Sequence, residues 1–216
     1  MINKFFLINF LFFNTQAFAN NITIKVMDSK QSKVEGVIVY LTPENNTLNH
    51  ALTKHPLIIF QKNKKFTPYI AVLQKGQEIN FKNQDDVTHH IYSASGENRF
   101  DFKIKAGEQN KSTVITTSGE VAMGCNIHDW MSGYVLAVDT PYFDQTNSQG
   151  LSIFKHIPPG SYKLTIWHPQ LETQKNEFTK KVEIHNNYHF KVILPKPLLP
   201  IPAQQNQDEF DFLEGY

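Results

Sequence analysis

The 216-residue sequence has one cysteine, almost no net charge and few signals for helix. A single cysteine cannot form a disulfide within the chain, so it is a buried thiol, an intermolecular partner or a functional thiolate. A formal net charge of +1 provides no basic field, and nucleic acid is therefore not expected as a partner. No internal repeat or coiled-coil heptad occurs either, so repeat architectures are not expected.

Long apolar runs are also missing, and the one near the N-terminus is short. It covers residues 5–13, is interrupted by Asn9, and lies between Lys4 and an A-x-A sequence that ends at Ala19. A basic start, a short apolar stretch and small residues at a cleavage position are typical of a secretory signal peptide. We therefore expect residues 1–19 to be a signal peptide, the protein to be periplasmic, and the mature chain to have no membrane span.

Strand signals are frequent along the rest of the chain. Segments such as GVIVYL, YIAVL, YVLAV and YKLTIW are rich in β-branched and aromatic residues and are separated by Gly, Asn, Asp, Pro and Lys. Spacings near ten residues are typical of antiparallel β-sandwiches. The sequence therefore predicts an all-β protein.

The cysteine lies in the pattern C-x2-H-x2-M, formed by Cys125, His128 and Met131. A thiolate, an imidazole and a thioether so close together suit a soft metal, copper above all. A blue-copper site needs a second histidine, for which His89 and His90 are the candidates. Adjacent side chains on a strand point to opposite faces, so only one of the two is expected at the metal. Taken singly, a buried thiol, a surface histidine and a core methionine are each ordinary; together they favour a metal site.

Two stretches, FTPYIAVLQKGQEINFKNQDDVTHH and GCNIHDWM, resemble the cupredoxins, the small blue copper proteins, with the short ligand loop of amicyanin. The resemblance implies a Greek-key cupredoxin β-sandwich over residues 56–141 that holds one type 1 copper ion. The combination of HHIYS and GCNIHDWM also resembles a group of exported bacterial proteins described as plastocyanin-like or methylamine-utilisation proteins. Matched residue by residue, the implied copper ligands are His89, Cys125, His128 and, in the axial position, Met131.

The sequence departs from the commoner cupredoxin pattern next to the first ligand. Thr88 stands where proline is usual, and His90 stands where an asparagine usually braces the cysteine loop. Asn126 is a candidate for that bracing. His90 is an outward-facing residue or, if the strand register is shifted by one, the ligand in place of His89.

A second resemblance lies outside the cupredoxin-like part. IKVMDSKQSKVEGVIVYL and GLSIFKHIPPGSYKL resemble the carboxypeptidase-regulatory or transthyretin-like sandwich. It implies a small β-sandwich built from residues 20–55 and 142–195, with the cupredoxin inserted between its strands. Alternatively, the first strands belong to the cupredoxin and the C-terminal part is separate. Residues 196–216, rich in proline and then acidic, are expected to be a flexible tail.

The histidines of this second sandwich are expected to be surface or structural residues. If the stretch HNNYHF is strand or turn, its two histidines are up to about 13 Å apart and are poor co-ligands. The set consists of His156, His168, His185 and His189.

The function expected from these patterns is single-electron transfer by a copper protein that is not an enzyme. Its partners would be redox proteins such as a cytochrome or a dehydrogenase. Copper delivery or storage is one alternative, although a lone thiolate with two imidazoles favours a redox site. An oxidase or nitrite-reductase-like enzyme needs further histidine-bound copper, and the H-x-H pairs common in such sites are missing. A non-redox interaction module is the remaining alternative.

Overall fold

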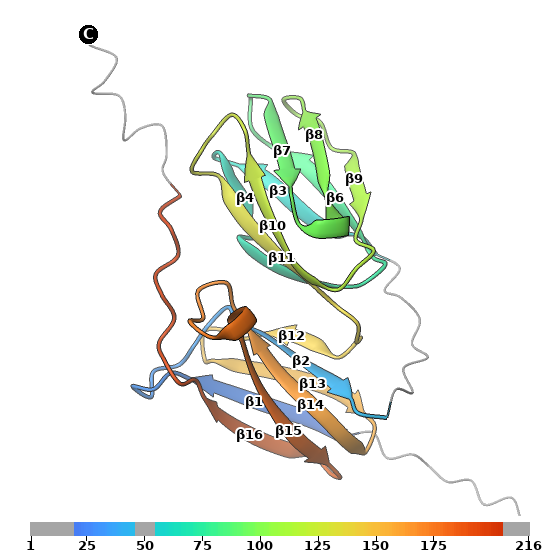
Figure 1. Ribbon diagram of the computed structural model, residues 1–216, viewed down its shortest axis with the longest axis vertical. Coiled ribbons are helices and arrows are strands. Elements are labelled where there is room, and N and C mark those ends of the chain that lie inside the picture. The colour runs from blue at the N-terminus through green and yellow to red at the C-terminus, as the bar shows by residue number, and fades with distance from the viewer. Residues whose placement is uncertain (1–19, 46–54, 205–216) are drawn as a thin grey trace, which may run out of the picture.

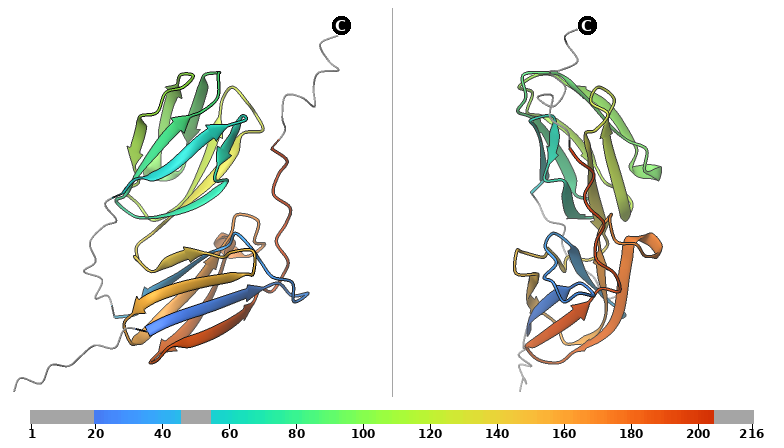
Figure 2. Two further views of the ribbon diagram at one scale, coloured as in Figure 1. Left: turned by 180° about the vertical axis from the view of Figure 1, so that it is seen from behind. Right: turned by 90° about the vertical axis from the view of Figure 1, so that its left-hand side faces the viewer.

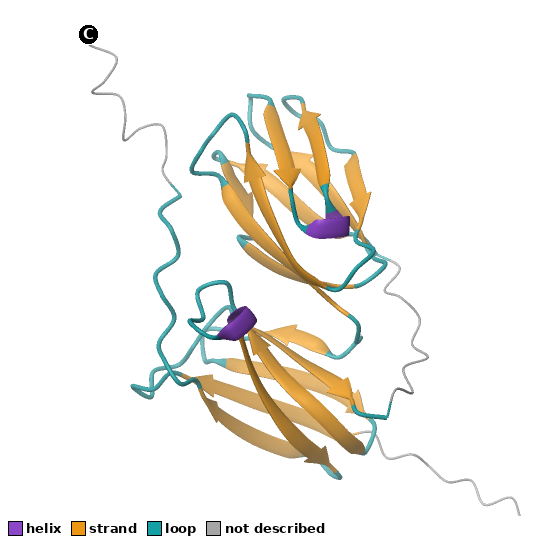
Figure 3. Cartoon of the chain, viewed as in Figure 1, coloured by secondary structure: helices purple, strands orange, loops and turns teal. Residues whose placement is uncertain are grey.

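The computed structural model describes residues 20–45 and 55–204, and these residues form two β-sandwiches (Figure 1). Strands dominate, and helix is limited in the described residues to the short 3-10 turns η1 (Gly96–Asn98) and η2 (Gln174–Asn176) (Figure 3). The all-β class expected from the sequence is therefore confirmed. The expected signal peptide and residues 205–216 of the expected tail lie outside the described residues.

The first sandwich joins strands from both ends of the described chain. One sheet has the order β13-β1-β16 and the other the order β12-β2-β14-β15. In β1, Ile22, Ile24 and Val26 are buried and alternate with less buried residues, so one face of the strand points into the core. The strands are β1 (Asn20–Met27), β2 (Ile38–Pro43), β12 (Phe143–Gln145), β13 (Leu151–Ile157), β14 (Gly160–Trp167), β15 (Glu177–Ile184) and β16 (Tyr188–Ile193).

The second sandwich is formed by the strands between β2 and β12. Its sheets have the orders β5-β11-β10-β7-β8 and β4-β3-β6-β9, and Phe81, Phe100 and Phe102 form an aromatic cluster in its core. The strands are β3 (Leu57–Lys62), β4 (Lys65–Thr67), β5 (Ile70–Gln74), β6 (Glu78–Asn83), β7 (His89–Ser93), β8 (Phe100–Ile104), β9 (Lys111–Val114), β10 (Gly119–Cys125) and β11 (Ser132–Val138).

Strand pairing differs in one respect from the antiparallel pattern expected from the spacing. Among the strands of residues 20–45 and 55–204, three pairs are parallel: β1 with β16, β5 with β11, and β3 with β6. Each pair joins strands that are not consecutive, because the chain crosses to other strands before it returns. Short spacings between strands constrain neighbours in the sequence and do not identify such distant partners.

The two sandwiches pack against each other through an apolar layer. The ribbons of the two sandwiches lie next to each other in both views of Figure 2. Ile38 and Trp167 of the first sandwich belong to one buried cluster with Ile70, Leu136 and Val138 of the second. Strand β2 is apolar on both faces for this reason, since Val39 and Leu41 enter the core of its own sandwich while Ile38 faces the layer. A continuous apolar run is what burial on both faces of a strand requires.

Polar contacts supplement this layer on two sides. Thr140, in the connection from β11 to β12, donates a hydrogen bond to the Leu41 carbonyl at 2.7 Å. After β16 the chain extends along both sandwiches, where the Leu199 amide donates to the Gln170 carbonyl at 3.1 Å. Further on, the Gln204 side chain contacts Ser132, with 3.1 Å between its Nε2 and the serine hydroxyl. Residues 196–204 therefore touch both sandwiches.

The loop after β14 contains a buried histidine. His168 is 3% exposed, and its Nδ1 accepts a hydrogen bond from the Gln170 amide at 3.1 Å. Burial lowers its pKa to about 4, so the imidazole is neutral at pH 7. Of the two roles expected for it, the structural one applies, whereas His156, His185 and His189 are exposed.

We predict that His168 makes folding stability fall in mild acid. In the unfolded chain its pKa is near 6.5, so between pH 6.5 and about 4 the unfolded state binds a proton that the folded state does not. As the pH is lowered through this range, the free energy of unfolding should therefore decrease. His168 should contribute up to about 1.4 kcal/mol of this decrease per pH unit. In His168→Gln this part of the slope should be absent.

Denaturant unfolding between pH 4 and 7 measures the effect. The exposed His185 provides the matched control, since His185→Gln should retain the wild-type slope. Equal slopes in wild type and His168→Gln would show that His168 does not drive the acid sensitivity.

Candidate metal centre

Strands β7 and β10 bring His89 and Cys125 together. They pair antiparallel, with Cys125 opposite Ile91. Side chains alternate along both strands, and in β7 His89 and Ile91 are buried while His90 is only half-buried. Cys125, 5% exposed, points inward in the same way. Alternation and pairing thus place the His89 imidazole, and not that of His90, beside the thiol.

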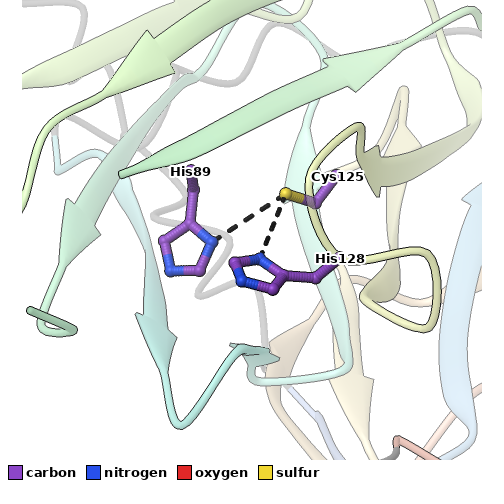
Figure 4. Close-up of side chains that lie close together, drawn as sticks. All are labelled: His89, Cys125 and His128. Carbon is purple, nitrogen blue, oxygen red and sulfur yellow. Dashed lines mark hydrogen bonds between the residues drawn. The ribbon is translucent and has the colours of Figure 1, made fainter. Parts of the chain in front are cut away.

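The loop after β10 adds His128 to the pair. Cys125 Sγ lies 3.9 Å from His89 Nδ1 and 3.7 Å from His128 Nδ1, and both rings present this nitrogen to the sulfur (Figure 4). The three ligand atoms all lie within 4.8 Å of one another, and the three residues are buried. Among the described residues, His89, Cys125 and His128 form the one group of three or more His, Cys, Asp or Glu side chains whose ligand atoms are close enough to hold a metal ion.

The donors of this group fit one type 1 copper site. Such a site takes one thiolate and two imidazole nitrogens in a trigonal arrangement, with a weak methionine as axial ligand. Cys125 supplies the sulfur, and His89 and His128 supply two nitrogens that face it. Burial suits a thiolate site of this kind, because it excludes competing water and fixes the ligands.

Met131, the expected axial residue, lies at the end of the same loop. It is 1% exposed and belongs to the same core cluster as Cys125. Its amide donates a hydrogen bond to the His128 carbonyl at 2.9 Å, which closes the loop into a tight turn. Trp130 packs against the His128 ring, with ring centroids 5.6 Å apart. The loop therefore carries a thiol, an imidazole and a buried thioether in a fixed order.

His89 is held from its other side by an acidic residue to which the sequence reasoning gave no role. Its Nε2 lies 2.8 Å from an Asp85 carboxylate oxygen. Asp85 is positioned in turn by Asn83, the asparagine of the F-x-N motif, whose side-chain oxygen accepts a hydrogen bond from the Asp85 amide at 2.9 Å. The Asn83 amide group donates to the Val87 carbonyl at 2.7 Å. Asn83 thus shapes the loop between β6 and β7.

His90 and Asn126 brace the cysteine loop from outside. The Asn126 amide donates to the His90 carbonyl at 2.9 Å. The Asn126 side-chain nitrogen lies 3.4 Å from His90 Nδ1, and His90 Nε2 lies 2.6 Å from an Asp101 oxygen. If Nε2 carries the proton toward Asp101, Nδ1 is free to accept from Asn126. This pair occupies the place in which the cupredoxin resemblance implies a bracing asparagine.

The environment of the cluster favours a charged thiolate. Burial alone would raise the pKa of Cys125, but hydrogen bonds from His89 and from the amides of Ile127, His128 and His90 lower it to about 6. For His89, burial works against protonation, yet contact with Cys125 and Asp85 outweighs it and raises the pKa above its ordinary value. A thiolate already formed at neutral pH is ready to bind a metal ion.

The comparisons with known proteins give a partial likeness. No protein-family model and no curated protein matches the chain. A copper-containing nitrite reductase from Thermus scotoductus SA-01 is 22% identical over 46% of this chain and 26% of its own, with a TM-score of 0.38. A variant of amicyanin in its Cu(I) form is 17% identical over 46% of this chain and 99% of its own, with a TM-score of 0.36.

A purple cupredoxin from Nitrosopumilus maritimus is 20% identical over 38% of this chain and 99% of its own, with a TM-score of 0.34. The expected resemblance to cupredoxins is thus found again, as a likeness over part of the chain. The TM-scores are low, and the fit of the site to copper rests on its own residues. The resemblance of the first sandwich to carboxypeptidase-regulatory domains stays a prediction.

We predict that the Cys125 thiol of the metal-free protein ionises near pH 6. The hydrogen bonds described above stabilise the thiolate, so thiolate should appear as the pH rises through about 6, well below the usual value near 8.5. Ultraviolet thiolate absorbance across a pH titration measures it, because Cys125 is the chain's one cysteine. Cys125→Ser gives the baseline. A midpoint between pH 8 and 9 would contradict the prediction.

Proposed function

We propose that this protein is a periplasmic type 1 copper protein that carries single electrons between redox partners. The observation that carries the proposal is the buried group of one thiol and two imidazole nitrogens, all within 4.8 Å of one another. The copper ligands are proposed to be Cys125, His89 and His128, with Met131 as the weak axial ligand. Bound copper would supply the chemistry by alternating between Cu(II) and Cu(I).

The role of the chain's own residues is to hold the donors in one arrangement for both oxidation states. His89 begins β7 and Cys125 ends β10, so both ligands belong to paired strands of one sheet. The hydrogen bond from the Met131 amide to the His128 carbonyl fixes the loop. Donors that do not move cost little reorganisation when an electron arrives, which is what a carrier requires.

Solvent lies closest to the site at the ligand loop. His128 is 8% exposed, compared with 0% for His89, and its neighbour Ile127 is 51% exposed. A redox partner, such as a cytochrome or a dehydrogenase, is proposed to dock at this edge. The described residues contain no helix long and apolar enough to cross a membrane.

Copper delivery is the main alternative to electron transfer. Reversible reduction and oxidation of the bound copper without its loss would distinguish the two functions. A delivery site stabilises one oxidation state and releases its metal, whereas a carrier keeps the metal through both. We propose no enzymatic reaction, since a copper oxidase or reductase needs further histidine-bound copper and the sequence has no H-x-H pair.

We predict that the mature protein, loaded with Cu(II), shows an intense visible band and narrow copper hyperfine splitting in its EPR spectrum. Both features arise from a covalent thiolate–copper bond, so Cys125→Ser should lose them. Any Cu(II) bound at other sites should still give its ordinary EPR signal in this variant. Repeated reduction and reoxidation should restore the full band without loss of copper. A weak spectrum that the substitution leaves unchanged would mean adventitious binding and would favour an interaction module. Loss of copper on reduction would favour delivery.

We predict that Met131→Leu raises the reduction potential and retains the intense visible band. Cu(I) is well satisfied by three ligands, whereas Cu(II) gains more from an additional axial donor, so loss of the Met131 thioether should favour the reduced state. Voltammetry of the copper-loaded protein measures the shift. Met123 is the matched control, since it is also buried in this core and lies on β10 two residues before Cys125. An equal shift in Met123→Leu and Met131→Leu would show that Met131 acts as core packing and not as a ligand.

A further inference from the structure

The Asp85 carboxylate joins three parts of the chain that meet behind His89. One of its oxygens lies 2.8 Å from His89 Nε2 and accepts from the Lys64 amide at 3.0 Å. The other oxygen accepts from the Asn63 amide at 2.6 Å. The side chain is only 10% exposed, so these contacts replace water around a negative charge.

The turn between β3 and β4 is shaped to provide those two amides. Asn63 and Lys64 both have a φ of 55°, a left-handed conformation that directs successive amides to one side. The Gln84 amide donates to the Gln61 carbonyl at 2.8 Å, which ties the loop before Asp85 to the end of β3. The carboxylate is therefore fixed by backbone amides of the turn that joins β3 and β4, two strands of the sheet β4-β3-β6-β9. His89 belongs to the opposite, five-stranded sheet of the same sandwich.

This position has a consequence for the His89 ring. A carboxylate at Nε2 requires that nitrogen to carry a proton, so when the Nδ1 proton that hydrogen-bonds Cys125 in the metal-free protein is displaced by a metal ion, the lone pair of the neutral ring lies on Nδ1. Nδ1 is the atom that faces Cys125 Sγ. The same hydrogen bond orients the ring and increases the basicity of the nitrogen that would bind a metal.

We propose that Asp85 is a positioning residue of the copper centre that sets the His89 tautomer and lowers the reduction potential. The inference rests on the proposed function and deepens it, because it names the group that tunes the site. A more basic imidazole stabilises Cu(II) more than Cu(I), so the carboxylate favours the oxidised state. Asp85 achieves this through His89 and not by contact with the metal.

The chain provides a matched control in the next residue. Asp86 carries the same charge one position along the loop but is exposed. Asp85→Asn and Asp86→Asn therefore each remove one negative charge close to the site, and only the first removes the carboxylate at His89. An asparagine at position 85 still offers an oxygen to the turn amides, so the loop has the means to remain folded.

The experiment compares wild type, Asp85→Asn and Asp86→Asn after loading with copper. Voltammetry should show an upward shift in potential for Asp85→Asn that is clearly larger than the shift for Asp86→Asn. In the diamagnetic Cu(I) form, nitrogen-15 NMR should show a slowly exchanging proton on His89 Nε2 in wild type and Asp86→Asn. In Asp85→Asn that proton should exchange faster.

Two results would overturn the inference. Equal shifts in potential for the two variants would mean that Asp85 acts only as a nearby charge. An Nε2 proton of His89 that exchanges rapidly in wild type would mean that the carboxylate does not hold the ring, and this measurement needs no variant to fold. A wild-type protein without a type 1 spectrum would instead overturn the proposed function, and this inference with it, before any variant is compared.

Discussion

The candidate metal centre depends first on the antiparallel pairing of β7 with β10. The pairing puts the last residue of β10, Cys125, opposite Ile91, and alternation along β7 then directs His89 to the same side. A shift of one residue in this register would turn His89 outward and bring His90 in. Ile91 and Val121, both 0% exposed, fix the register because a shift would expose them. The apolar core thus decides which histidine meets the thiol.

Support around the cluster comes from several directions and from groups far apart in the sequence. Asp85 holds His89 from behind, while Asn126 and the His90 carbonyl brace the cysteine loop from outside. The second support differs from the pattern that the cupredoxin resemblance implies, since His90 stands where an asparagine is expected and Asn126 follows the cysteine. Rigid support on both sides is consistent with a centre whose ligands keep their places when the charge of the metal changes.

Much of this arrangement could be predicted from local patterns. β-Branched and aromatic composition, with turn residues about every ten positions, predicted the strands, and C-x2-H-x2-M placed a thiol, an imidazole and a thioether on one loop. The role of Asp85 could not be predicted in this way, because it depends on a turn near Asn63 that belongs to another sheet. The parallel strand pairs and the contact of Gln204 with Ser132 could not be predicted for the same reason. Each is a contact between distant segments, and short-range spacing does not determine such contacts.

A crystal structure of the copper-loaded protein, compared with the metal-free form, tests the central claim most directly. It should show one copper ion bound by Cys125 Sγ and by the Nδ1 atoms of His89 and His128. The frame of β7 and β10 should be unchanged between the two forms. Copper bound elsewhere, for example at the exposed His185 or His189, with the cluster of Cys125 empty, would contradict the claim.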